Sequence, residues 1–186
     1  LATNENDILA RFFDTGVYEA AEVVPTLSPS MDIQVASNFE RYLFYRTGGD
    51  AARVRQQMAT FQATKRLAVD VAAGEPVDPL IRAGRGDTAA TLATIRRFHG
   101  EFGYLLDPHT AVGVHAGLRH LDAAAPMICL ATAHPAKFGD AIRRATGRDL
   151  AHHPLLDALA GLPTRVETVP ADTRAVAAVV ERTVAG

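Results

Sequence analysis

One short apolar run constrains the fold of this chain more than any other feature. Met127, Ile128, Cys129 and Leu130 follow one another without the alternation that marks a half-buried strand. Such a run fits a strand covered on both faces, as in a parallel sheet, although so short a run also fits a buried helix. We predict a strand over residues 126–133, in which Cys129 is buried as a small apolar side chain.

Most of the remaining chain carries the apolar spacing of amphipathic helices. This spacing predicts helices over residues 8–15, 31–44, 51–69, 92–102, 108–121 and 135–146. A last helix is expected after residue 172, with Asp172 as its N-cap. Further strands are expected at the start of the chain and at 165–169, and residues 74–86 are expected to form a loop. Strands separated by helices imply crossover connections, so we predict a helix-rich α/β fold with a mostly parallel sheet, part of a larger one.

Composition and charge count against several classes of function. The chain has 186 residues and a formal net charge of -2, which gives no electrostatic reason to expect nucleic acid or an anionic membrane as a partner. No apolar stretch reaches the ~18 residues that span a membrane. The sequence contains no HExxH, CxxC or EF-hand pattern, so no metal site is expected. A single cysteine fits a reducing compartment, and we expect a cytoplasmic protein.

The first residue and the lysine content raise the question of missing sequence. The chain begins at Leu1, and residues 1–3 read like the end of a strand, so we expect further sequence upstream. Lys65 and Lys137 are the only lysines, against 17 arginines. Neither lysine lies in a sequence context that predicts a desolvated, nucleophilic amine.

Polar side chains follow apolar runs at three junctions, where an open α/β sheet binds its ligands. Each junction also has an ordinary structural explanation. Thr132 could bond nearby backbone, Asp107 could cap a helix that starts at Pro108, and His134 could be a turn residue before a proline. Residues 84–88 could form an anion-binding nest or a flexible turn capped by Asp87 or Thr88. The candidate pocket residues from the three junctions are Asn4, Asn6, Asp107, His109, Thr110, Thr132 and His134.

Four segments, in this order along the chain, resemble the threonine synthases. They are residues 2–7 (ATNEND), 26–32 (TLSPSMD), 106–111 (LDPHTA) and 130–138 (LATAHPAKF). That family belongs to the fold-type II pyridoxal-phosphate enzymes. The resemblance therefore implies a partial three-layer sandwich in which residues 1–186 form the C-terminal part of the large pyridoxal-phosphate domain.

The resemblance also implies a reaction, the conversion of O-phospho-L-homoserine and water to L-threonine and phosphate. In the family, the Schiff-base lysine and the loop that holds the cofactor phosphate lie upstream of the matching region. We therefore expect no catalytic residue in this chain, an inactive chain on its own, and the upstream part of the same protein as its partner. Thr132 matches the family threonine whose hydroxyl faces the pyridine nitrogen of pyridoxal phosphate. Asp107, His109 and Thr110 are expected to border the same pocket.

Two other functions are consistent with the same residues. The chain could be a non-catalytic binding or regulatory domain that has kept this part of the fold. It could also be an unrelated hydrolase that uses Asp107 and His109 as its acid–base pair.

Overall fold

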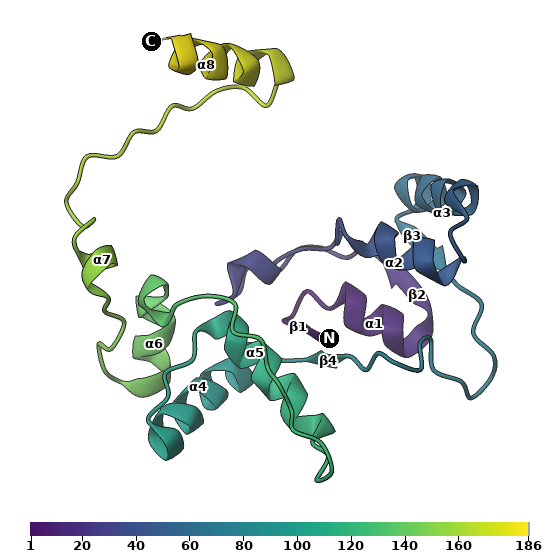
Figure 1. The fold of residues 1–186 in the computed structure, drawn as a ribbon, viewed down its shortest axis with the longest axis horizontal. Helices are drawn as coiled ribbons and strands as arrows, with labels where there is room; N and C mark the ends of the chain where they lie inside the picture. Colours follow the sequence, from purple (N-terminus) through teal and green to yellow (C-terminus); the bar gives the residue numbers. More distant parts are fainter. Residues whose placement is uncertain (186) are drawn as a thin grey trace. The chain divides into compact units, whose positions relative to one another are not determined.

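The structure is a computed structural model that describes residues 1–185. The chain divides into two compact units, Leu1–His153 and a smaller unit that begins at Pro154. The first unit contains all four strands and six of the described α-helices (Figure 1). Its elements are β1 (Ala2–Thr3), α1 (Ile8–Thr15), β2 (Val17–Glu19), α2 (Phe39–Arg46), α3 (Ala51–Thr64), β3 (Arg66–Ala68), β4 (Gly84–Arg85), α4 (Thr88–Phe102), α5 (Pro108–Gly117) and α6 (Gly139–Thr146).

Short 3-10 turns complete the first unit, and two helices make up the second. The turns are η1 (Pro29–Met31), η2 (Leu118–His120) and η3 (Pro135–Lys137). The second unit contains α7 (Pro154–Asp157) and α8 (Thr173–Ala185), and Asp172 caps α8 as the sequence predicts. None of the helices over residues 1–185 is both long and apolar enough to cross a bilayer.

The sheets are small. β1 pairs with β4 in parallel, with Ala2 opposite Gly84, and β2 pairs with β3 in antiparallel register, with Tyr18 opposite Leu67. The prediction of a helix-rich α/β fold is therefore confirmed, and so is a strand at the start of the chain. β4 lies inside the segment predicted to be a loop, because a two-residue strand carries no periodicity that a sequence pattern could reveal.

Four predicted helices are longer than the real α-helices. Those predicted over residues 108–121 and 135–146 are each part α-helix and part 3-10 turn, and the other two differ for reasons outside the local pattern. The helix predicted over residues 31–44 begins only at Phe39, because the Asp32 carboxylate accepts the backbone N–H and the hydroxyl of Thr26 and so holds an irregular loop. The helix predicted over residues 51–69 ends at Thr64. Lys65 adopts a left-handed conformation with φ 58°, and the chain then pairs with β2.

Two apolar clusters form the core of the first unit. One is aromatic, and in it Phe12 makes edge-to-face contacts with Tyr18 and Phe39. The other lies between α4, α5 and α6, which pack together in Figure 1, and it buries Ile95, Val114 and Ile142. The second cluster fixes the N-terminal end of α5, where the candidate site residues lie.

The prediction of a buried strand over residues 126–133 is wrong for the described chain. These residues form an extended segment outside any strand, and Ile128 and Leu130 are 78% and 80% exposed. Cys129 is exposed as well. β1 and β4 pair only with each other, so this segment has no neighbouring strand among the described residues. The strand predicted at residues 165–169 is likewise extended but unpaired.

Candidate functional site

Asp107 is the N-cap residue of α5 and the centre of the candidate site. Its carboxylate oxygen Oδ1 accepts the backbone N–H groups of His109 at 2.9 Å and Thr110 at 3.3 Å. Pro108 occupies the first helical position, where its missing N–H costs nothing. Asp107 therefore caps the helix, as one of the two sequence interpretations holds, and it does so with only 2% of its surface exposed.

The second carboxylate oxygen of Asp107 is hydrogen-bonded to Thr110, and Thr110 is hydrogen-bonded to the backbone of Thr132. The Thr110 hydroxyl donates to Asp107 Oδ2 in a short hydrogen bond. With its proton committed, Thr110 Oγ1 accepts the backbone N–H of Thr132 at 3.0 Å. The Thr132 hydroxyl lies 3.4 Å from Thr110 Oγ1 on an exposed residue. The backbone at Thr132 is thus fixed, while the residue as a whole stays exposed.

His109 joins the same carboxylate to a distant turn. Its Nδ1 lies 3.1 Å from Asp107 Oδ1, and its Nε2 accepts the backbone N–H of Ser30 at 3.2 Å. Because a backbone N–H can only donate, Nε2 carries no proton, and the proton of a neutral imidazole is on Nδ1. The ring also packs against Phe138, with centroids 4.9 Å apart. His109 is therefore a buried, neutral linker between Asp107 and Ser30.

Asn4 and Asn6 belong to a second polar cluster, which holds the other end of that turn. Asn4 Nδ2 donates to Ser28 Oγ at 2.9 Å and to Asp32 Oδ1 at 2.7 Å. Asn6 Nδ2 donates to the same carboxylate oxygen at 3.1 Å. Both asparagines are buried, and their amides position residues 24–32. Asn6 also lines a small cavity of about 120 Å³ together with Ser30 and Met31.

His134 lies apart from both clusters. Its Nδ1 accepts the backbone N–H of Ala136 at 3.1 Å, which caps the turn η3. Its ring makes an edge-on contact with that of His153, with centroids 4.9 Å apart. The structure thus brings Asp107, His109, Thr110 and Thr132 into one hydrogen-bonded group. It shows His134 as a turn residue.

Comparison with known proteins gives the family. Residues 110–180 match the family described as threonine synthase, C-terminal. The chain is 41% identical over 177 residues to the threonine synthase of Methylobacillus glycogenes, and 40% identical over 186 residues to that of Corynebacterium glutamicum. The chain is homologous to the threonine synthases.

Solved threonine synthases share the fold of this homologue. The PLP-bound threonine synthase of Brucella melitensis superposes with a TM-score of 0.84 at 39% identity, over 97% of this chain and 39% of that one. The yeast threonine synthase gives a TM-score of 0.79 at 33% identity, over 99% of this chain and 41% of that one. The matches to the M. glycogenes and C. glutamicum threonine synthases cover 92% and 95% of this chain, but only 37% and 38% of those proteins.

Two residues of this threonine synthase homologue were missed as site candidates. Ser30 N–H donates to His109 Nε2, and Asp32 Oδ1 accepts the amides of both buried asparagines. Both lie in the segment 26–32 that carries the family resemblance, so that segment was the available signal. Ser30 and His109 are 79 residues apart, and a single sequence does not show that two such distant positions are in contact.

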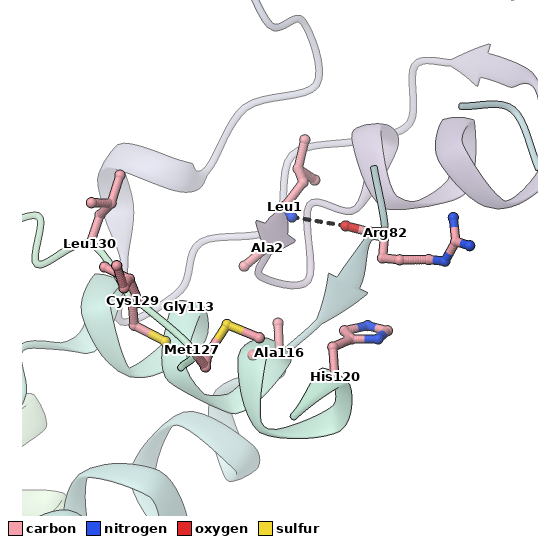
Figure 2. A pocket seen from close by; sticks show the side chains of 11 residues that line it. Leu1, Ala2, Arg82, Gly113, Ala116, His120, Met127, Cys129 and Leu130 are labelled. Carbon is pink, nitrogen blue, oxygen red and sulfur yellow. Dashed lines mark hydrogen bonds between the residues drawn. The ribbon is translucent and has the colours of Figure 1, made fainter. Parts of the chain in front are cut away.

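A cavity of about 380 Å³ lies beside the segment that precedes Thr132. Figure 2 shows it between Leu1 and Ala2 on one side, Gly113 and Ala116 of α5 on another, and the extended residues 127–130. β4 can lie close to α5 because Gly84 has no side chain. A Cβ at Gly84 would lie only 3.0 Å from the Cβ of Ala116. Mainly apolar side chains line the cavity. Four of them, residues 127–130, belong to the segment that was predicted to be a buried strand.

The remaining reactive groups offer no separate site. Lys65 and Lys137 are both exposed, which agrees with the expectation that neither is a desolvated amine. The proposed nest at residues 84–88 is not available to an anion, because Thr88 N–H donates to Glu5 Oε1 at 2.7 Å and Ala90 N–H donates to Asp87 Oδ1 at 2.8 Å. Over residues 1–185, no three metal-ligating side chains converge.

Proposed function

We propose that this chain forms the C-terminal part of a pyridoxal-phosphate-dependent threonine synthase. The full enzyme would convert O-phospho-L-homoserine and water to L-threonine and phosphate. The observation that carries the proposal is the exposed position of Thr132, whose backbone Asp107 fixes through Thr110. Homology to threonine synthases over nearly the whole chain supports it.

The residues present fit the pyridine side of that cofactor. Thr132 N–H is already bonded to Thr110, and the long 3.4 Å contact of the Thr132 hydroxyl leaves its proton able to turn toward a ring nitrogen. A hydroxyl can donate to an unprotonated pyridine nitrogen, but it does not hold that nitrogen protonated as a carboxylate would. Thr132 is therefore the residue of this chain that would hold the cofactor.

The chemistry divides between the cofactor and the protein. Pyridoxal phosphate, when bound, supplies a conjugated ring that stabilises negative charge at substrate carbons. The Thr132 hydroxyl would limit how strongly the ring withdraws electrons, because it leaves the nitrogen uncharged. Asp107, Thr110 and His109 would keep that hydroxyl and the neighbouring turn in place, since preorganised polar groups need no rearrangement during reaction.

The rest of the enzyme is proposed to lie upstream. We propose that residues 1–186 complete a large domain of three layers with a mostly parallel sheet, and that the upstream part brings the Schiff-base lysine and the phosphate-binding loop. The exposed apolar segment 126–131 supports this, because a neighbouring strand would cover it. The exposure of both lysines also supports an outside source of the reactive amine. The single cysteine and the proposed biosynthetic role fit the cytoplasm.

The structure counts against the Asp107–His109 hydrolase. A general base needs a free nitrogen within reach of a substrate proton, but His109 Nε2 is occupied by Ser30 N–H. No observation favours a non-catalytic domain over the enzyme.

The test compares Thr132→Ala with Thr132→Ser in the full-length protein. Loss of one neutral hydrogen bond to the cofactor costs about 1 kcal/mol, so Thr132→Ala should bind pyridoxal phosphate about fivefold more weakly. Its visible absorption spectrum should change, and phosphate release from O-phospho-L-homoserine should fall. Thr132→Ser should behave like the unaltered protein. Equal affinity and spectra in all three proteins would contradict the proposed contact.

A further inference from the structure

We propose that Asp107 is a positioning residue that fixes two separate walls of the proposed cofactor site. One wall is the backbone at Thr132, and the other is the Ser30 turn, which comprises residues 28–31. The inference rests on the proposed function, because it concerns the site in which Thr132 would meet the cofactor. It gives Asp107 a role beyond capping α5, and it adds the Ser30 turn to the site.

The number of bonds that Asp107 accepts exceeds what a helix cap requires. Capping uses one oxygen, and Asp107 Oδ1 alone accepts both of the capping N–H groups. Oδ2 is left for the Thr110 hydroxyl, and Oδ1 also meets His109 Nδ1. Asn or Ser would cap the helix about as well, but neither supplies two acceptor oxygens. A carboxylate at position 107 is thus explained by its bonds to two side chains, those of His109 and Thr110, which it orients.

The first wall depends on the direction of the Thr110 hydroxyl. A hydroxyl has one proton and two lone pairs, and the proton of Thr110 goes to Asp107 Oδ2. Its oxygen is then oriented as an acceptor toward Thr132 N–H. Thr132 lies in an extended segment outside any helix or strand, so this bond is a main restraint on its backbone.

The second wall depends on the tautomer of His109. Asp107 Oδ1 favours the proton on Nδ1, which leaves Nε2 as the acceptor for Ser30 N–H. The turn is held at its other end by Asn4, which donates to Ser28 Oγ. The Ser30 turn is therefore fixed at both ends, and one of the two anchors passes through Asp107.

The central experiment uses Asp107→Asn in the full-length protein without cofactor, selectively ¹⁵N-labelled at histidine, serine and threonine. In the unaltered protein, the ring ¹⁵N resonances of His109 should show the proton on Nδ1. In Asp107→Asn, Oδ1 still caps the helix and faces His109 Nδ1, while Nδ2 replaces Oδ2 and donates to Thr110 Oγ1, so the Thr110 hydroxyl loses its acceptor. The companion variant Asp107→Ser keeps a cap, but its single short hydroxyl should not reach His109 Nδ1, so the proton is no longer held there. The Thr132 amide should exchange with solvent about tenfold faster in Asp107→Asn, and the amides of both Ser30 and Thr132 should do so in Asp107→Ser.

Two further variants separate the walls and remain informative if Asp107→Asn does not fold. Thr110→Val should speed exchange at Thr132 alone and leave the His109 tautomer unchanged, and Thr110→Ser should restore slow exchange. His109→Phe keeps a ring of similar shape without nitrogens, so it should speed exchange at Ser30 alone. The inference is overturned if Asp107→Ser leaves both the His109 tautomer and the Ser30 amide unchanged, or if Thr110→Val and His109→Phe change both amides alike.

The cofactor enters only as a second readout. With pyridoxal phosphate bound, Asp107→Asn and Thr110→Val should alter the visible spectrum in the same direction as Thr132→Ala. If Thr132→Ala leaves the spectrum unchanged, the proposed function loses its cofactor contact, whatever the resonances show. If Thr132→Ala alters the spectrum but Asp107→Asn does not, the positioning role fails while the proposed function stands.

Discussion

The side-chain amide of Asn4 donates to the carboxylate of Asp32 across 2.7 Å, and this bond joins positions 28 residues apart. The same carboxylate oxygen accepts Asn6 Nδ2 and the Thr26 hydroxyl. One acidic side chain therefore organises the loop that carries the Ser30 turn, which packs against the start of the chain.

Replacement of Asp32 by alanine should destabilise the protein strongly. It would leave the Asn4 and Asn6 amides without a charged acceptor, and hydrogen bonds to charged groups contribute about 1.5–3 kcal/mol each. We expect a loss of about 2–4 kcal/mol in the free energy of unfolding, measured by chemical denaturation. Asp14→Ala is the matched control, because Asp14 is an exposed residue of α1. A loss no larger than in that control would contradict the stabilising role of the Asp32 hydrogen bonds.

Gly84 and Gly100 should respond in opposite directions to alanine. A Cβ at Gly84 would lie 3.0 Å from the Ala116 Cβ, where β4 crosses α5, so Gly84→Ala should cost about 1–3 kcal/mol. Gly100 lies within α4 with nothing within 4 Å of the added carbon, so Gly100→Ala should stabilise by about 0.5–1 kcal/mol. Thermal unfolding of both variants measures the difference, and the same sign in both would show that β4 and α5 are not in close contact.

Neither lysine of this chain should react with pyridoxal phosphate in the way that a catalytic lysine does. Lys137 lies in the exposed turn η3, and Lys65 ends α3 with its side chain in solvent. A nucleophilic lysine needs a desolvated amine, and neither of these exposed side chains provides one. Mixing the chain with the cofactor and recording a visible spectrum should show no stable covalent adduct. A stable band that disappears in Lys137→Ala would show that Lys137 is reactive after all.

The stability of the protein should fall below pH 6.5 because of His115. Burial lowers the pKa of His115 below 6.5, the nearby Arg119 guanidinium lowers it further, and Asp87 partly opposes both. The imidazole Nε2 also lies 2.9 Å from an Arg119 nitrogen, where only the neutral ring can accept a hydrogen bond. The folded state thus binds the proton less readily than the unfolded state, so stability is lost as the pH falls from about 6.5 through the lowered pKa.

His115→Gln isolates this contribution. Glutamine does not titrate, so between about pH 7.5 and about pH 5.5 the variant should lose less stability than the unaltered protein. Urea unfolding of both proteins at the two pH values gives the comparison. An equal loss in the two would mean that the His115 pKa is the same in the folded and unfolded states.

The sequence predicted the elements whose signals are local. The caps at Asp107, Asp87 and Asp172 and the end of α1 at Gly16 follow from side chains that bond within three residues or from one glycine, which has φ 76°. The lengths of α2 and α3 did not follow. Their limits are set by Asp32 bonding Thr26 and by β3 pairing with β2, and periodicity does not report such contacts.

The site was predicted as a set of residues but not as an arrangement. Thr132 and Asp107 came from the family resemblance and from strand-end reasoning, yet the connection between them runs through Thr110 and depends on where one hydroxyl proton lies. Asn4 and Asn6 were expected at a pocket, and the structure gives them buried acceptors. The buried strand at residues 126–133 failed because strand formation depends on a neighbour, which no property of the run itself supplies.

The open backbone of residues 126–131 has a consequence for how such a polypeptide survives in a cell. From Met127 to Thr132 it carries no charge and no proline, and most of its side chains stand in solvent. Short, uncharged, extended stretches of this kind stack readily against copies of themselves. In the full-length enzyme proposed above, a strand that covers this edge would also protect the molecule from self-association, so the two proposed parts should be safest when they are synthesised together.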